Sequence, residues 1–274
     1  MIRLKIAIRN ITRHKLRSIL SLGMIAGAVT SMIIFRGFSQ YSLDSLKIIA
    51  AENQFGHMQI GKEKYWAPGA ESRKSRMFNL KEIEQLKKNH PYIENISGRL
   101  SFFGLVSNGD LSIGGKIIGI DTINEPKFAK SMAIMSGAFF SSSDSHEAMI
   151  GTLLAKQMNV KTGDSITVLT NTIDGVMNAM DLVVGGIFSA GIDEIDAQVI
   201  FLPLITSQKI LDTEDVDVGV VRFNALEQSE AHANDILKDV TNISRELTKK
   251  TWRELAVLYR LYKEDHITQR YFGV

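Results

Sequence analysis

The chain has 274 residues, of which 45% are hydrophobic and 23% are charged, and its formal net charge at pH 7 is +2. This is the composition of a folded protein with one large domain or two smaller ones, and so small a net charge gives no general attraction to nucleic acid. The absence of cysteine excludes disulfide bonds, thiolate metal sites and cysteine nucleophiles.

The first 17 residues carry positive but no negative charge. Leu4, Ile8 and Ile11 fall on one face of a helix, so we predict an amphipathic helix over residues 1–17. Beside a membrane span, such a helix lies in the plane of the lipid headgroups. The alternative is a basic topology signal without a further role. The basic residues assigned to the membrane interface are Arg3, Lys5, Arg9, Arg13, Lys15 and Arg17.

Residues 18–35 form an uncharged, strongly apolar run. A helix of this length rises about 27 Å, close to the hydrocarbon thickness of a bilayer. A single crossing segment must be helical, because every backbone polar group has to be satisfied within it. We therefore assign a transmembrane helix to residues 18–36 and expect the helix to continue to about residue 51. The preceding positive charge predicts a cytoplasmic N-terminus, with the main domain on the other side of the membrane.

Two other interpretations of the apolar run remain open. A cleaved signal peptide has a shorter apolar run that ends in small residues, whereas this run ends in Phe35-Arg36. A buried core helix would not need the basic flank. Gly23 and Gly27 form a G-x-x-x-G pair inside the run, a pattern that lets another membrane helix approach closely. Chance is the alternative for this pair, since glycine is common in membrane helices.

Beyond the membrane helix, the apolar pattern alternates between strand and helix periods. A strand at residues 57–60 is followed by a polar stretch and a helix at residues 80–89. Two strands then meet at Asn108-Gly109, a dipeptide typical of hairpin turns. After Gly137 the segments are mostly short strands. Pro203 opens a further helix, and a strand and an amphipathic helix come after it.

The order of these elements predicts an α+β fold. Strand–helix–strand–strand, then a mostly β segment and a final strand–helix, is typical of a split βαβ core with an insertion. We place the core in residues 52–136 and 203–250, and the inserted β-rich subdomain in residues 137–202. Residues 251–274 are predicted to contain a terminal helix.

No cluster of residues indicates catalysis. The histidines are scattered, and His146-Glu147 lacks the second histidine of a zinc-binding H-E-x-x-H motif. Asp193, Glu194 and Asp196 are close in sequence, and we predict that they form a solvated turn. We therefore expect no catalytic, metal or cofactor site in this chain.

Several segments, taken together, resemble a known family. They are GHMQI at 56–60, AMIGTLLAKQMNVKTGDSITV at 148–168, VVGGIFSAGIDEID at 183–196, VIFLPLITSQKIL at 199–211 and TWREL at 251–255. Their order and spacing look like those of ABC transporter permeases of the MacB, FtsX and lipoprotein-releasing type, including the LolC and LolE subunits. The resemblance covers nearly the whole chain, although no single motif is diagnostic.

The resemblance implies a permease of the bacterial inner membrane with four membrane helices. A periplasmic, porter-like α+β domain with a β-rich insertion lies between the first and second helices. The terminal helix at 251–274 would then return to the membrane. A cytoplasmic ABC ATPase binds the ATP, so no enzyme activity is expected here. The other implied partners are membrane lipid and a second permease copy or a paralogue.

Three functions agree with these features, and a fourth, an envelope enzyme, stays open without a visible set of catalytic residues. Lipoprotein release is favoured, and export of peptides or drugs by a MacB-like transporter is the first alternative. The second alternative is a bitopic sensor or scaffold whose periplasmic domain binds a partner. The chain ends about where the family's second membrane helix begins, so we expect it to be the N-terminal portion of a permease.

An apolar cargo would contact the membrane-proximal part of the long helix. The predicted substrate path consists of Phe38, Tyr41, Leu43 and Leu46. Packing of these residues against the returning helix is the alternative. The sequence does not identify the cargo, an acylated protein or an apolar peptide, and does not distinguish a homodimer from a heterodimer.

Overall fold

The computed structural model describes residues 13–67, 72–121, 123–125, 128, 132–140 and 142–264. Two compact units make up the chain, and the larger is Ile49–Arg260. The other contains the long helix α2 (Lys15–Ile48). The predictions for Arg3, Lys5, Arg9 and residues 265–274 lie outside the described residues.

Helix α2 contains the predicted membrane segment and is about 50 Å long at the usual rise per residue. Among the described residues, one helix is long and apolar enough to cross a membrane; it extends over Lys15–Glu52, and none of its most apolar part is buried. A Cβ atom added at Gly23 or Gly27 would contact nothing. Helix packing at this glycine pair therefore stays a prediction.

In the larger unit, the described strands join into one sheet of ten. The strands are β1 Met58–Lys62, β2 Ile93–Ser107, β3 Ser112–Ile120, β4 Ala133–Gly137, β5 Glu147–Gly151, β6 Ser165–Asn171, β7 Met177–Ser189, β8 Val199–Pro203, β9 Val218–Phe223 and β10 Leu247–Thr251. The helices are η1 Ile49–Gln54, α3 Glu63–Trp66, η2 Lys74–Arg76, α4 Lys81–Asn89, α6 Thr152–Met158, α7 Asp193–Gln198, α8 Leu204–Leu211, η3 Leu226–Gln228, α9 Ser229–Ile243, α10 Trp252–Leu255 and α11 Val257–Glu264.

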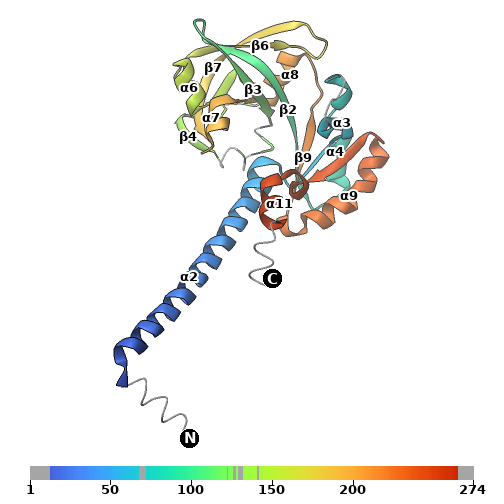
Figure 1. Ribbon diagram of the computed structural model, residues 1–274. Helices are drawn as coiled ribbons and strands as arrows, with labels where there is room; N and C mark the ends of the chain where they lie inside the picture. Colours follow the sequence, from blue (N-terminus) through green and yellow to red (C-terminus); the bar gives the residue numbers. More distant parts are fainter. Residues whose placement is uncertain are drawn as a thin grey trace. The chain divides into compact units, whose positions relative to one another are not determined.

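One part of the sheet has the order β10-β1-β9-β2, with every neighbouring pair antiparallel. Figure 1 shows β2 beside β9, with α4 and α9 in the same part of the larger unit. Helix α4 connects β1 to β2, and α9 connects β9 to β10. Ile83 of α4 and Ile236 of α9 are fully buried in the same apolar core as Ile60 of β1. This is the predicted split βαβ arrangement.

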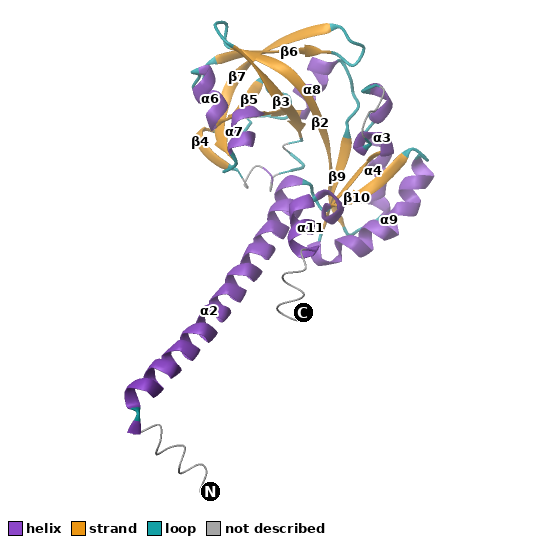
Figure 2. Cartoon of the chain, viewed as in Figure 1, coloured by secondary structure: helices purple, strands orange, loops and turns teal. Residues whose placement is uncertain are grey.

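The remaining strands close into a barrel in the order β2-β3-β8-β5-β7-β6 and back to β2 (Figure 2). Strand β4 is added to β7 outside this ring. Val106, Ile117, Val168 and Val184 alternate with more exposed residues along their strands and are fully buried, and Ile150 is fully buried between buried neighbours in β5. Closure into a barrel gives these strands two paired edges each, which protects them from pairing with other chains.

The barrel begins earlier in the chain than predicted. Strand β2 runs from the split βαβ sheet into the barrel, and β3 also belongs to the barrel. Residues 137–202 therefore supply most of the barrel but do not close it alone. The whole insertion lies between two neighbouring strands of the split βαβ sheet, β2 and β9.

The terminal helix differs from its predicted form. The sequence from Trp252 indicates one continuous helix, but the structure has two, α10 and α11, which are separated at Ala256. Trp252 and Ala256 are both buried in a small apolar cluster, which fixes the backbone between the two helices.

The prediction of a solvated turn is wrong for Asp196. This residue lies in α7 and is buried. Its carboxylate accepts hydrogen bonds from the Ala190 N–H at 2.7 Å, the Ser189 hydroxyl at 2.7 Å and the Thr152 hydroxyl at 3.1 Å. Asp196 thus ties α7 to the end of β7 and the start of α6. Asp193 and Glu194 are exposed, as expected.

Candidate functional site

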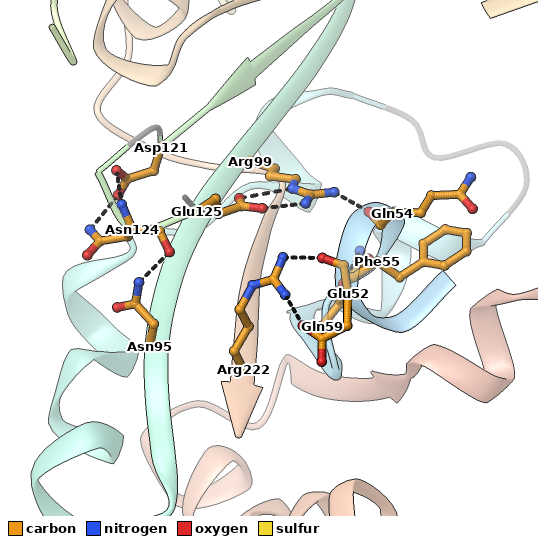
Figure 3. Close-up of polar contacts among 10 residues, drawn as sticks. All are labelled: Glu52, Gln54, Phe55, Gln59, Asn95, Arg99, Asp121, Asn124, Glu125 and Arg222. Carbon is orange, nitrogen blue, oxygen red and sulfur yellow. Dashed lines mark hydrogen bonds and ion pairs between the residues drawn. The ribbon is translucent and has the colours of Figure 1, made fainter. Parts of the chain in front are cut away.

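Helix η1, the first element of the larger unit, is held by a set of polar side chains. Helix η1 follows α2 directly and has π-helical hydrogen bonding. The last carbonyl groups of any helix lack partners within the helix, and positive charge is favourable there. In η1 these partners are two arginines from the split βαβ sheet (Figure 3).

Arg222 of β9 is the first of them. One guanidinium nitrogen, Nη2, donates to the Glu52 carbonyl oxygen at 2.5 Å, and Nη1 donates to the Glu52 carboxylate at 3.0 Å. Only 4% of the Arg222 side chain is exposed. Burial lowers the pKa of Arg222, whereas Glu125 and Glu52 act to raise it. A buried guanidinium of this kind is held by its acidic partners.

Arg99 of β2 is the second. Its Nη1 donates to the Gln54 carbonyl oxygen, while Nε donates to the Glu125 carboxylate at 3.0 Å and Nη2 bonds the other carboxylate oxygen. Glu125 has no exposed side-chain surface. The guanidinium also lies over the Phe128 ring, 4.9 Å from its centre. Arg99 therefore joins η1 to the loop that follows β3.

His57 fixes the Glu52 carboxylate from the other side. The Phe223 N–H donates to Nδ1 of His57 at 3.0 Å. Because a backbone N–H can only donate, Nδ1 is the acceptor and the ring proton is on Nε2. Nε2 then donates to the Glu52 carboxylate at 2.9 Å. His57 and Arg222 thus hold one oxygen each of the same carboxylate.

A glycine permits this close approach. Gly56 has φ +74°, and a Cβ atom there would lie 2.3 Å from Cγ1 of Val220. Any other residue would therefore both strain the backbone and push η1 away from β9. Gln59 donates to the Phe55 carbonyl at 3.1 Å and satisfies one more group of the same turn.

The segment that leaves the larger unit, which begins with α10, packs against η1. Ala50 and Ala51 of η1 pack with Trp252 and Ala256 in one buried apolar cluster. The Trp252 N–H donates to the His57 carbonyl at 3.2 Å. Strands β1 and β10 are neighbours. The segment that enters the larger unit and the segment that leaves it are therefore joined directly. We call the residues Glu52, Gln54, His57, Arg99, Glu125, Arg222 and Trp252 the junction.

The charged side chains of the junction are paired with one another. They are two arginines and two glutamates. Over the described ranges of the chain, no group of three or more histidine, aspartate or glutamate side chains could hold a metal ion.

The predicted site residues are not part of the junction. Phe38 and Tyr41 of α2 are 66% and 71% exposed, and Leu43 and Leu46 are half-buried. Arg13, Lys15 and Arg17 are exposed. Nothing in the structure tests their assignment to a substrate path or a membrane interface. The junction residues were missed, although a lone arginine in the apolar strand VGVVRF was a usable signal.

Comparison with known proteins identifies the family. The model of the MacB-like periplasmic core domain matches residues 18–239. The chain belongs to this family. The match confirms the predicted relation to MacB- and FtsX-like ABC transporter permeases and the predicted α+β class. As a MacB-like periplasmic core domain with an apolar N-terminal helix, the chain is a membrane-anchored part of an ABC-type permease.

Two solved structures share the MacB-like fold. The extracellular domain of the noncanonic ABC-type transporter YknZ from Gram-positive bacteria is 11% identical, with a TM-score of 0.52 over 71% of this chain and 99% of that chain. The periplasmic region of MacB from Actinobacillus actinomycetemcomitans is 13% identical, with a TM-score of 0.53 over 74% of this chain and 92% of that chain. No curated protein matches.

The junction predicts a strong energetic coupling between Glu52 and Arg222. In a double-mutant cycle of Glu52→Gln and Arg222→Gln, measured by unfolding of the full chain in detergent, we expect a coupling of about 2 kcal/mol because the pair is largely desolvated. The control cycle is Lys62→Gln with Glu246→Gln, an ion pair of 3.0 Å whose acidic partner is exposed. It should give no resolvable coupling. Equal coupling in the two cycles would contradict this account of the junction.

Proposed function

We propose that this MacB-like chain is the permease subunit of an ATP-driven transporter that works by mechanotransmission. A cytoplasmic ATPase would move the membrane helices, and the periplasmic domain would follow. The observation that carries this proposal is the pair of arginines, Arg222 buried and Arg99 largely buried, which bind the last carbonyl groups of η1 to β9 and β2. Mechanical coupling requires a rigid connection of this kind between helix and domain.

The remaining partners follow from the same proposal. The ATPase would bind on the cytoplasmic side and supply all ATP hydrolysis. A second permease copy or a paralogue would complete the transporter, and the basic residues 13–17 would lie near the lipid headgroups. The location is the bacterial inner membrane, with the core domain in the periplasm. The family match and the apolar helix α2 support this arrangement.

Lipoprotein release is the favoured activity within this proposal. The exposed aromatic side chains of Phe38 and Tyr41 offer apolar surface to an acyl chain or an apolar peptide. MacB-like export of peptides or drugs is the second candidate, and the fold shared with the periplasmic region of MacB favours it. The two activities differ in cargo, since only lipoprotein release requires a cargo that carries a lipid anchor.

An uncoupling experiment tests the proposed mechanism. The full-length permease and its ATPase are reconstituted in liposomes with an acylated cargo protein, and ATP hydrolysis and cargo release are measured together. In the Glu52→Gln, Arg222→Gln double variant, hydrolysis should persist while release per ATP falls by about tenfold, because helix motion no longer reaches the sheet.

Arg245→Gln is the matched control, since Arg245 is exposed on the same domain. It should release cargo like the unchanged protein. Full release by the double variant would refute mechanotransmission through the junction. Release of the acylated cargo, but not of a soluble apolar peptide, would favour lipoprotein release over MacB-like export.

The proposed topology predicts a labelling pattern. The native chain has no cysteine, so a single cysteine can be introduced at exposed Lys161 or at exposed Arg13. In intact spheroplasts, a membrane-impermeant maleimide should label Lys161→Cys. It should label Arg13→Cys only after the membrane is permeabilised. The reverse pattern would show that the orientation is wrong.

A further inference from the structure

The barrel is attached to the split βαβ sheet by few covalent links. In the part of the chain that the structure describes, the backbone passes between them twice. One passage is along β2, which pairs with β9 up to Arg99 and with barrel strand β6 from Leu105. The other is the connection from α8 to β9, which ends at Asp217. The two parts also share one buried apolar core, which includes Ile83 of α4 and Ile117 of β3. Because apolar packing is not directional, polar contacts at the two passages would fix the orientation of one part relative to the other.

A buried carboxylate bridges these two passages. Oδ2 of Asp217 accepts a hydrogen bond from the Ser101 N–H of β2 at 2.7 Å. The Asp217 N–H donates to the Arg99 carbonyl at 3.0 Å. The returning connection is therefore bound to β2 on both its main chain and its side chain, at the position where β2 leaves the sheet.

Arg73 joins a third segment to the same point. Its Nη2 donates to the Ser101 carbonyl at 2.7 Å and to Oδ2 of Asp217 at 3.2 Å. Arg73 comes from the segment between β1 and α4, which belongs to the split βαβ part of the chain. One guanidinium thus reaches both passages between the sheet and the barrel.

The energetics indicate a geometric role rather than a stabilising one. The Asp217 side chain is only 3% exposed, and its Oδ1 has no hydrogen-bond partner. Burial raises the pKa of Asp217, and Arg73 and the Ser101 N–H only partly oppose this effect. A buried ion pair with an unsatisfied atom adds little to stability, and such pairs can instead specify one arrangement of the parts they join.

We propose that Asp217 and Arg73 form a lock that fixes the barrel to the split βαβ sheet. The inference rests on the proposed mechanical function, because it extends the path of force beyond the junction. Arg99 of β2 and Arg222 of β9 bind the carbonyl groups of η1. The lock joins β2 to the connection that leads into β9, at the point where both meet the barrel. Displacement of the sheet then moves the barrel with it.

Distance measurements on the full chain in nanodiscs, without ATPase, test the lock. Spin labels are placed at Lys88→Cys on α4 and Lys161→Cys on the barrel, both exposed positions in a cysteine-free chain. For the otherwise unchanged protein, pulsed electron paramagnetic resonance should give a distribution of distances between the labels with one narrow maximum. Asp217→Ala and Arg73→Gln should each lose this single maximum. Asp217→Asn keeps an acceptor for the Ser101 N–H, so the width of its distance distribution should lie between those of the unchanged protein and Asp217→Ala.

Two controls separate a lock from a general loss of structure. Asp212→Asn changes an exposed aspartate in the same connection and should keep the narrow maximum. The hydrogen exchange of β6 and β7 should stay close to that of the unchanged protein, even where the loss of one partner of the buried pair lowers the Tm. A broadened distance distribution, together with faster hydrogen exchange in β6 and β7, would assign Asp217 a purely structural role and overturn the proposal.

A narrow maximum in both Asp217→Ala and Arg73→Gln would also overturn the lock. That result would leave the permease assignment intact, because the uncoupling experiment at Glu52 and Arg222 tests it separately. If Asp217→Ala does not fold, Arg73→Gln and Asp217→Asn decide the question, since both retain most of the buried volume.

Discussion

A helix that ends inside a folded domain must find partners for its last carbonyl groups, and the structure depends on how this chain meets that requirement. Arg222 and Arg99 bind the carbonyl oxygens of Glu52 and Gln54. Each arginine is itself held by a glutamate. Because both arginines come from paired strands, the end of η1 is fixed to two neighbouring strands of the sheet.

The strand order explains how one short helix can control a whole domain. In the order β10-β1-β9-β2, the entering strand β1 lies between β10, the last strand before the terminal helices, and β9, which carries Arg222. The barrel is inserted between β9 and β2, the two strands that hold the arginines. Movement of η1 would therefore act on the strands from which the barrel extends.

Local patterns in the sequence were sufficient to predict much of the fold. The apolar run of α2, the helix of α4 and the Asn108-Gly109 turn all have periods or dipeptides with a direct structural meaning, and Gly109 has φ +97°. Strand β10 was missed, because its sequence LTKKT is polar and its pairing with β1 is long-range. Strand β4 was missed because it is short and exposed on an outer edge.

The junction could not be predicted, for a related reason. The sequence predicts that the long helix ends at about residue 51, and it gives no local signal for the π-helical form of η1 or for its contacts with β2 and β9. Glu52 and Arg222 are 170 positions apart in the sequence, and without aligned relatives no local pattern joins them. Asp196 shows the same limit, since its burial depends on hydroxyl and N–H groups supplied by other segments.

The central claim is that η1 is held to the sheet and does not fray. Hydrogen–deuterium exchange of the full-length protein in nanodiscs measures this directly, through peptides that cover residues 49–54. The account predicts that these amides exchange as slowly as those of β9, because their opening would break the arginine contacts. Exchange as fast as that of an exposed helix end would contradict the account.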